Sequence, residues 1–410
     1  MTRFTSVMLL LLSLIMTACV GMLGSQRVSV EIPERQNWSG VTLHGDIAQI
    51  EEISTELTGR YGAEHKGDEQ GRTVTVFNLR GDVLTITTMD AEVAGTDDAE
   101  FDEIFKQMVA EELLIESDTT SMDNVEVAAN TAEAEAKAMI TEGYTYTYDE
   151  DGYLVGSLYS YDGGVVEHRY KLDEYGCVVL DEQLEDSGKL ESRTYIKYDN
   201  RGNEAERRTE DGDGRTMLKV VYEYDNADRC IEELRYNDLD ELQRRIEKQY
   251  DNSGRITQIL TFDAYDMSDG SIKYTYGDND RDTEYTSFDS SGAFEERVVE
   301  RYDAAGNLLE HGRYDADDKV IEATLHSYDD TGRLIELRRM VNGDSLLSVS
   351  TYKYDADGRL IEATDEDKLY KSYLTTTYKY DEHHNLVEER VYSGKKREPQ
   401  YVIEYVISYR

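Results

Sequence analysis

Proline is nearly missing from this sequence: Pro33 and Pro399 are the only two among 410 residues. Because proline has no backbone N–H group, its scarcity leaves almost every residue able to donate to a β-ladder. Hydrophobic residues are also scarce, at 39%, while charged residues make up 32%. A two-layer domain of this length would normally contain more leucine, isoleucine and valine. The composition therefore favours β-structure over an ordinary compact core.

Basic residues are also few: 44 lysines and arginines stand against 87 aspartates and glutamates, giving a net charge of −43. Phosphate backbones and anionic lipid repel such a polyanion, so we expect no nucleic-acid partner. Basic proteins, cations and neutral glycans stay open as partners. The alternative is that the charges only keep a sheet with many edges soluble.

Catalytic signatures are absent as well. The sequence has no Gly-x-Ser-x-Gly, His-Glu-x-x-His or Cys-x-x-Cys motif. The adjacent histidines His383 and His384 fall in a predicted turn, where a solvated loop is a simpler interpretation than a metal site. Carboxylate pairs of the glycosidase kind cannot be singled out among so many acids. We therefore expect no enzyme, with a carbohydrate-active enzyme as the less favoured alternative.

Long apolar segments are missing too, apart from one short run near the N-terminus. Arg3 precedes the apolar run Val7–Ile15, which is too short to span a membrane stably. Such a charged start followed by a short apolar run is typical of a signal peptide, here over residues 1–18. No other stretch of the sequence is long and apolar enough to cross a bilayer.

The end of this run, Met16-Thr17-Ala18-Cys19, resembles a bacterial lipobox. The resemblance implies that Cys19 is lipidated, that residues 19–40 form a tether, and that the lipid holds the protein at a membrane. The residue after the cysteine is Val20 and not the aspartate associated with inner-membrane retention. We therefore expect a lipoprotein of the outer membrane or cell surface. A plain secretory signal with an incidental cysteine is the alternative.

Tyrosine is abundant, with 32 residues against 7 phenylalanines and 1 tryptophan, and it marks a repeat. Tyrosine often precedes aspartate, and a turn residue, usually glycine, lies three positions after that aspartate. A weaker echo midway, as at Tyr236-Asn237 and Tyr314-Asp315, indicates a unit of about 13 residues, one strand plus one turn. From Leu172 onward the spacing is 26 residues, and the pairs or close variants start at Tyr148, Leu172, Tyr198, Tyr224, Tyr250, Tyr276, Tyr302, Tyr328, Tyr354 and Tyr380.

Each position of the repeat has a physical reason. The aspartate can accept hydrogen bonds from backbone amides ahead of it, and glycine tolerates the positive φ that closes such a turn. Alternation, as in Tyr352-Lys353-Tyr354, places tyrosines on one face of a strand and charges on the other. We expect equivalent tyrosines of successive hairpins to stack into ladders. The candidate ligand surface is accordingly Tyr222, Tyr224, Tyr274, Tyr276, Tyr352, Tyr354, Tyr378 and Tyr380.

The register of the repeat also decides the state of the two remaining cysteines. Cys177 and Cys230 lie about two repeats apart, which is roughly 19 Å at ~4.8 Å per strand. A disulfide needs Cα atoms within about 7 Å of each other. We therefore predict two free cysteines that pack as small hydrophobic side chains.

The motif Tyr-Asp-x-x-Gly-Arg-Leu-Ile-Glu, which starts at Tyr328 and at Tyr354, resembles the YD-repeat or Rhs-repeat family of bacterial envelope and secreted proteins. The resemblance covers roughly residues 141–410. In large members such hairpins spiral into a shell around a C-terminal toxin, whereas here the array runs to residue 410. Short lipoproteins without a toxin domain are the closer likeness. We expect an all-β array of antiparallel hairpins, a coiled single-layer sheet or partial spiral because strand twist accumulates.

Two segments precede the array. Strand patterns over 41–91 include Phe77 to Leu84, which looks like a degenerate repeat. Residues 92–140 then form an acidic insertion, which we expect to be partly helical. Its apolar residues at helical spacing either pack against the sheet or bind a partner; they are Phe101, Ile104, Phe105, Met108 and Val109.

One acidic stretch has alternating carboxylates, as in a Ca²⁺-binding loop: Asp278, Asp280 and Asp282. Thr283 stands where such a loop needs glycine, and Arg281 adds a positive charge. An acidic turn of a variant repeat is therefore the simpler interpretation. Ca²⁺ is the only cofactor that the sequence brings into question.

These observations lead to one functional prediction with an alternative. We expect a lipid-anchored protein of the bacterial cell envelope that presents a tyrosine-rich β-surface to a protein or glycan ligand. The alternative is a structural spacer of the envelope.

Overall fold

The computed structural model describes residues 17–20, 26–29, 43–60, 63–78, 80–90, 140–161, 164–279, 281–343 and 345–410. All regular elements among these residues are β-strands, which confirms the all-β prediction. The expected helical insertion over 92–140 lies outside the described residues, apart from Ile140, which begins a strand. Strands β1 (Thr17–Val20) and β2 (Gln26–Ser29) form a short antiparallel pair that includes the backbone of Cys19.

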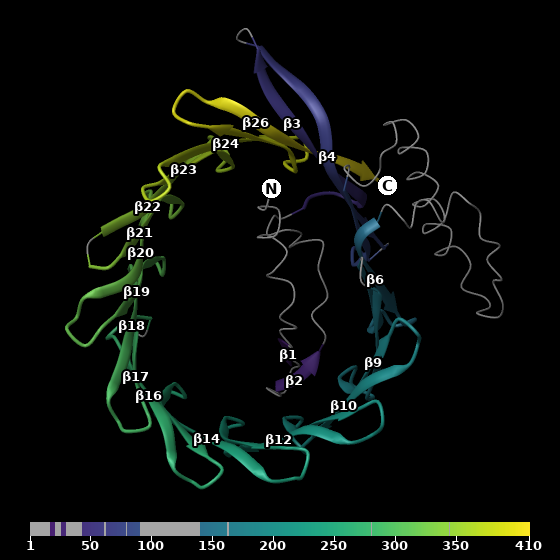
Figure 1. Ribbon diagram of the computed structural model, residues 1–410, viewed down its shortest axis with the longest axis vertical. Helices are drawn as coiled ribbons and strands as arrows, with labels where there is room; N and C mark the ends of the chain where they lie inside the picture. The colour runs from purple at the N-terminus through teal and green to yellow at the C-terminus, as the bar shows by residue number, and fades with distance from the viewer. Residues whose placement is uncertain are drawn as a thin grey trace, which may run out of the picture. The chain divides into compact units, whose positions relative to one another are not determined.

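Contacts divide the chain into two compact units. The first contains Met1–Glu31, His168–Thr377 and Tyr392–Arg397. Its repeat strands follow one another side by side in an antiparallel series (Figure 1). They are β8 (Gly164–Leu172), β9 (Val178–Glu185), β10 (Leu190–Tyr198), β11 (Glu204–Asp211), β12 (Thr216–Tyr224), β13 (Cys230–Tyr236), β14 (Leu242–Tyr250), β15 (Ile256–Asp263), β16 (Ser268–Tyr276), β17 (Thr283–Phe288), β18 (Phe294–Tyr302), β19 (Leu308–Tyr314), β20 (Val320–Tyr328), β21 (Leu334–Val341), β22 (Ser345–Tyr354), β23 (Leu360–Asp367) and β24 (Ser372–Tyr380).

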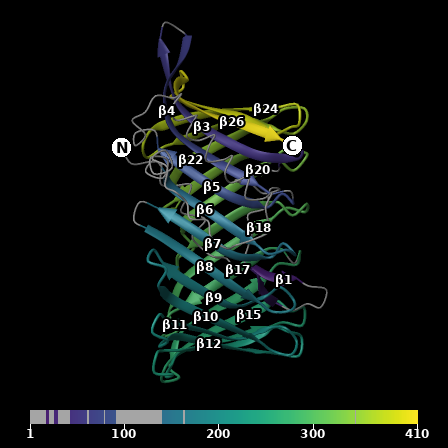
Figure 2. The same ribbon diagram turned by 90° about the vertical axis from the view of Figure 1, so that its right-hand side faces the viewer.

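The second unit contains the first and the last strands of the series. It contains Ile32–Glu167, Tyr378–Val391 and Glu398–Arg410. In both ribbon views β26 lies beside β3, which lies beside β4 (Figure 2). The strands that lie wholly or mainly in this unit are β3 (Ile47–Arg60), β4 (Ala63–Phe77), β5 (Val83–Asp90), β6 (Ile140–Tyr148), β7 (Leu154–Tyr161), β25 (Leu386–Ser393) and β26 (Glu398–Tyr409).

The hydrogen-bonded strand order is cyclic. It runs from β3 to β26 in sequence order and returns from β26 to β3, so the 24 strands form a closed sheet. The prediction of an open coil or partial spiral was therefore wrong in this respect. Strand β26 pairs antiparallel with β3 from Tyr401↔Glu56 to Tyr409↔Ile47. Closure is favourable because it satisfies the backbone groups of two edges that would otherwise stay unpaired.

The turns have the conformation that the repeat predicts. Glycine adopts positive φ three residues after the aspartate, for example 83° at Gly332 and 87° at Gly358. Where glycine is replaced, Asp228 and His384 take the same left-handed conformation, at 60° and 70°. Aspartate and similar polar residues tolerate this region better than most side chains.

Burial differs between the two units. Across β15 every residue is half-buried, as expected when a single layer leaves both sheet faces partly accessible. The second unit instead has a hydrophobic cluster of fully or nearly fully buried side chains: Leu43, Ile47, Ile50, Phe77 and Val83. A smaller cluster in the first unit is centred on Val178 and Ile196.

Candidate functional site

The turn after each Tyr-Asp pair is closed by the aspartate side chain. In the repeat of Asp329, Oδ1 accepts the backbone N–H groups of Thr331 at 2.9 Å and Arg333 at 3.0 Å. Its Oδ2 accepts Nε of Arg333 at 2.8 Å. The backbone N–H of Gly332 donates to the Asp329 carbonyl at 2.9 Å. The repeat motif therefore encodes a self-contained turn held by one carboxylate.

The same turn is fastened to the next hairpin by an arginine and a tyrosine. The Arg333 guanidinium lies 4.9 Å from the centre of the Tyr354 ring, one repeat further on. The Tyr354 hydroxyl donates to the Leu334 carbonyl at 2.8 Å. We call this arrangement of aspartate, arginine, tyrosine and carbonyl the repeat latch. It recurs with Asp225, Arg229, Tyr250 and the Cys230 carbonyl, and with Asp251, Arg255, Tyr276 and the Ile256 carbonyl.

The latch differs from the tyrosine ladders that alternation suggests. Equivalent tyrosines such as Tyr250 and Tyr276 are two strands apart, about 9.6 Å at ~4.8 Å per strand. Aromatic rings interact favourably at centroid distances of about 4.5–7 Å, so these rings are too far apart to stack directly. The Arg255 guanidinium instead lies over the Tyr276 ring at 4.4 Å.

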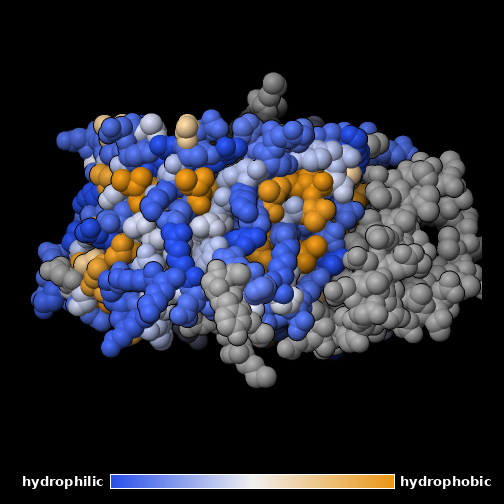
Figure 3. Space-filling view, turned by 90° about the horizontal axis from the view of Figure 1, so that it is seen from above, coloured by the Kyte–Doolittle hydropathy of each residue, from blue (hydrophilic) through white to orange (hydrophobic). Residues whose placement is uncertain are grey.

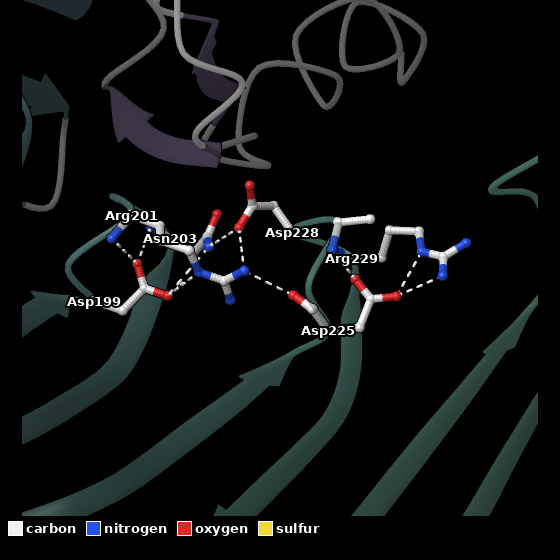
Figure 4. A network of polar contacts seen from close by, with 7 residues as sticks. Asp199, Arg201, Asn203, Asp225, Asp228 and Arg229 are labelled. Carbon is white, nitrogen blue, oxygen red and sulfur yellow. Dashed lines mark hydrogen bonds and ion pairs between the residues drawn. The ribbon is translucent and has the colours of Figure 1, made fainter.

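Neighbouring turns are also joined along the edge of the sheet (Figure 4). Arg201 donates to the Asp225 carbonyl at 2.8 Å and pairs with the Asp228 carboxylate at 2.8 Å. The fully buried Asn203 side chain donates to Asp199 at 3.2 Å and to Asp228 at 3.0 Å. The two turns therefore form one polar network and cannot move independently.

The opposite edge carries a second set of inter-repeat contacts, which sequence reasoning missed. A cation from one hairpin lies over the aromatic ring of the next strand and pairs with the aspartate in the turn that follows. Arg297 lies 4.8 Å from the Tyr314 ring centre and 2.8 Å from the Asp318 carboxylate. The 26-residue spacing of the cations was the available signal. The other sets are Lys219 with Tyr236 and Asp240, and Arg245 with Phe262 and Asp266.

Removing one latch hydroxyl gives a first prediction. We expect Tyr354→Phe to lower the free energy of unfolding by about 0.5–1.5 kcal/mol, because the Leu334 carbonyl loses its side-chain donor. Urea denaturation followed by circular dichroism measures this change. Tyr352→Phe is the matched control, since no hydrogen bond of its hydroxyl is present among the described residues. An equal effect in both variants would contradict the latch.

The turn carboxylates give a second prediction, on acid stability. Hydrogen bonds from Thr331 and Arg333 hold the pKa of Asp329 below its ordinary value of 3.8, and the backbone N–H of Arg359 does the same for Asp355. A lowered carboxyl pKa contributes stability above pH 3.8 that is lost as pH falls below it. We expect the melting temperature of the array to drop between pH 5 and pH 2. Equal melting temperatures at both pH values would show that these turns do not contribute.

The latch divides six of the eight candidate tyrosines into two groups. All eight are half-buried. The hydroxyls of Tyr224, Tyr276 and Tyr354, which directly precede the aspartate, donate to backbone carbonyls. The hydroxyls two residues earlier make no hydrogen bond within the described part of the chain; they belong to Tyr222, Tyr274 and Tyr352. Tyr378 and Tyr380 make contacts of their own in the second unit.

A pair of glutamates in the second unit is the acidic site that sequence reasoning missed. Glu52 on β3 lies directly opposite Tyr405 on β26, and the Tyr405 hydroxyl donates to Glu389 on β25 at 2.8 Å. Burial, and to a smaller extent the charge of Glu389, raises the pKa of Glu52 to about 7. Burial also raises the pKa of Glu389, although the Tyr405 hydrogen bond opposes this effect. Among 87 acids no local pattern marks these two, because their strands meet only when the sheet closes.

The acidic stretch considered for Ca²⁺ lies before β17. Asp278 is exposed, Asp280 lies outside the described residues, and the Asp282 carboxylate accepts hydrogen bonds from Asn279 and from the backbone of Tyr302. The described residues contain no group of three or more metal-ligating side chains. Ca²⁺ binding here stays a prediction.

Cys177 and Cys230 are free, as the repeat spacing predicts. Cys177 is buried, and Cys230 is half-buried on β13. Within the described ranges, no helix has the length and apolar character that a membrane span needs.

The repeat geometry can now be compared with known proteins. Residues 328–370, which hold two successive Tyr-Asp turns, match the family model described as RHS Repeat. The match therefore identifies an RHS repeat at residues 328–370. A comparison with curated proteins finds no match.

Three solved structures illustrate what this chain is similar to. A chain in the crystal structure of TcdB2-TccC3-Cdc42 is 13% identical, with a TM-score of 0.34, and the match covers 81% of this chain and 18% of that one. A chain in the structure of TcdB2-TccC3 is 12% identical, with a TM-score of 0.31, and the match covers 94% of this chain and 21% of that one. A porin-like protein from Bacteroides uniformis is 9% identical, with a TM-score of 0.19, and the match covers 89% of this chain and 98% of that one. This chain thus spans about a fifth of the first two chains.

Proposed function

We propose that this RHS-repeat protein is a non-enzymatic scaffold of the bacterial cell envelope that presents a tyrosine-rich sheet surface to a protein or glycan ligand. The repeat latch carries the proposal. In the repeats that contain it, the latch uses the aspartate, the arginine and one tyrosine to hold hairpins together. The motif residues therefore have a structural role, and binding falls to the side chains between the turns.

The ligand surface is best assigned to Tyr222, Tyr274 and Tyr352. They occupy the same position of their repeats on β12, β16 and β22, because their numbers differ by multiples of 26. Each is half-buried, and its hydroxyl makes no hydrogen bond among the described residues. An aromatic ring with a free hydroxyl stacks on sugars and also anchors protein interfaces. One face of the molecule, drawn in Figure 3, shows apolar patches between polar side chains.

A pull-down and a glycan array with the chain lacking residues 1–19 test this proposal. We expect a ligand whose binding is lost when Tyr222, Tyr274 and Tyr352 are all replaced by alanine. The control replaces three exposed turn tyrosines, Tyr175, Tyr265 and Tyr370, which are 63%, 85% and 70% exposed. Binding lost equally in both triple variants, or kept in both, would reject this surface.

A structural spacer is the second candidate. The observation that favours it is the set of contacts that join neighbouring repeats at both edges of the sheet. A chain that binds no ligand in either assay, yet whose deletion alters the cell envelope, would favour the spacer over the binding protein.

Attachment to the membrane through a lipid on Cys19 completes the proposal. The lipobox-like sequence Met16-Thr17-Ala18-Cys19 supports it. We expect the intact protein to incorporate labelled palmitate in a Gram-negative host and to fractionate with the outer membrane. Cys19→Ser should abolish both. Labelled lipid that persists in this variant would exclude Cys19 as the acceptor.

A further inference from the structure

In the seam formed by β25, β26 and β3, as far as the structure describes it, the glutamates on one face are paired with cations and those on the other face are not. Adjacent glutamates on these strands point to opposite faces, because side chains alternate along a strand. On one face the glutamates have cations: Glu51 accepts from Arg72 at 2.7 Å, and Glu388 pairs with Lys379 and Arg390, each at 2.7 Å. On the other face stand Glu52 and Glu389.

Neither Glu52 nor Glu389 is paired with a cation in the described part of the chain. Glu52 lies between Tyr405 of β26 and Thr73 of β4. Among the described residues, the charge of Glu389 acts on Glu52, and both glutamates act on Tyr405. Tyr378 and Tyr401 are the other titratable groups of this cluster, which Tyr405 and Glu389 connect. Half-buried carboxylates without a positive partner are costly when both are ionised.

We propose that Glu52 and Glu389 make this seam a proton-operated latch: protonation of the pair holds β26 against β3, and ionisation of both loosens the closure. Tyr405 lies between the two acids, opposite Glu52 and hydrogen-bonded to Glu389. Burial raises the pKa of the Tyr405 hydroxyl, so it stays a neutral donor throughout. The charge that changes with pH is therefore that of the glutamates.

The direction of the effect follows from the raised carboxyl pKa. Folded Glu52 binds its proton more tightly than an unfolded glutamate, whose ordinary value is 4.5. Its stabilising contribution is complete below pH 4.5 and is lost as pH rises to about 7. The seam is accordingly tightest in mild acid and loosest above neutral pH.

The proton-operated latch is tested in the full chain by hydrogen exchange of the β26 amides at pH 5 and pH 8, corrected for the intrinsic exchange rate. We expect protection of β26 to fall by about tenfold or more in the wild type, since one pKa unit corresponds to a tenfold change. In Glu52→Gln the fall in protection should be clearly smaller, because only Glu389 is left to ionise. The control Glu404→Gln removes an acid that pairs with Lys66 on the other face, and it should keep the wild-type pH dependence.

Three outcomes would overturn the proposal of a proton-operated latch. They are a wild type without pH dependence, a Glu52→Gln variant that loses protection like the wild type, and an equal loss in β15, which is remote in the strand order. Circular dichroism checks that Glu52→Gln is folded. Should it fail to fold, Glu389→Gln provides the same comparison.

Discussion

Replacing Phe77 by alanine is expected to lower the free energy of unfolding by about 3–5 kcal/mol. Phe77 is 0% exposed and ends β4 within the cluster of the second unit. Its neighbours Ile47 and Ile50 lie on β3, the strand that pairs with β26. A cavity at this point removes apolar contacts from the strands that close the sheet. Urea denaturation and the melting temperature both measure the loss.

Leu239→Ala is the matched control for this substitution. Leu239 lies in a turn of the first unit and is 70% exposed, so its removal opens no cavity. We expect a change within about 0.5 kcal/mol. If Phe77→Ala were as mild as Leu239→Ala, the buried cluster would not be what stabilises the closure.

Asn385→Ala is expected to cost about 2–4 kcal/mol, because it leaves buried backbone groups without partners. The Asn385 side chain is 0% exposed. Its Oδ1 accepts the His44 N–H at 2.7 Å, and its Nδ2 donates to the His44 carbonyl at 2.8 Å and to the Tyr409 hydroxyl at 2.7 Å. One side chain thus joins three segments that are far apart in sequence.

Asn226→Ala is the control, because Asn226 is an exposed residue in the turn of an ordinary repeat. Native-state hydrogen exchange adds a local measurement: the β26 amides should lose protection in Asn385→Ala and keep it in Asn226→Ala. A uniform loss across β12 and β26 would indicate general destabilisation, and no loss at all would remove Asn385 from the seam.

The repeat latches and the contacts of the seam have different mechanical roles. Repeat latches join only neighbouring hairpins, so their energies add along the array as in other repeat proteins. The seam around Asn385 and Arg410 occurs where the last strand meets the first. There Arg410 donates to the carbonyls of Phe77 and Asn78 and pairs with Asp46. Changes at the seam should affect closure, whereas changes in a latch should affect one hairpin pair.

Several sequence predictions follow the structure closely because the interactions that they describe are short-range. The Asp329 turn is complete within five residues, so residue types at fixed offsets specify it. The separation of Cys177 from Cys230 needed only the period and the strand spacing. The degenerate repeat near Phe77 likewise shows repeat-like bonding, since the Asn78 side chain accepts the backbone N–H groups of Arg80 and Asp82.

The choice among tyrosines could not be made in this way. Tyr352 and Tyr354 have the same alternation and the same residue type, yet only the Tyr354 hydroxyl reaches a carbonyl of the preceding hairpin. That difference depends on the register between strands, where a bulge between Lys353 and Tyr354 shifts the pairing. A pattern along one strand does not contain this information.

The order of residues alone fixed where the repeat strands and turns lie, that the turn residue after each Tyr-Asp pair takes positive φ, and that the described part of the chain is all-β, because each of these depends on contacts within one or two repeats. Only the tertiary structure decided that β26 closes onto β3 and that Glu52 and Glu389 meet there without a cation. Closure joins residues more than 300 positions apart, and it depends on the twist and register summed over all the strands between them.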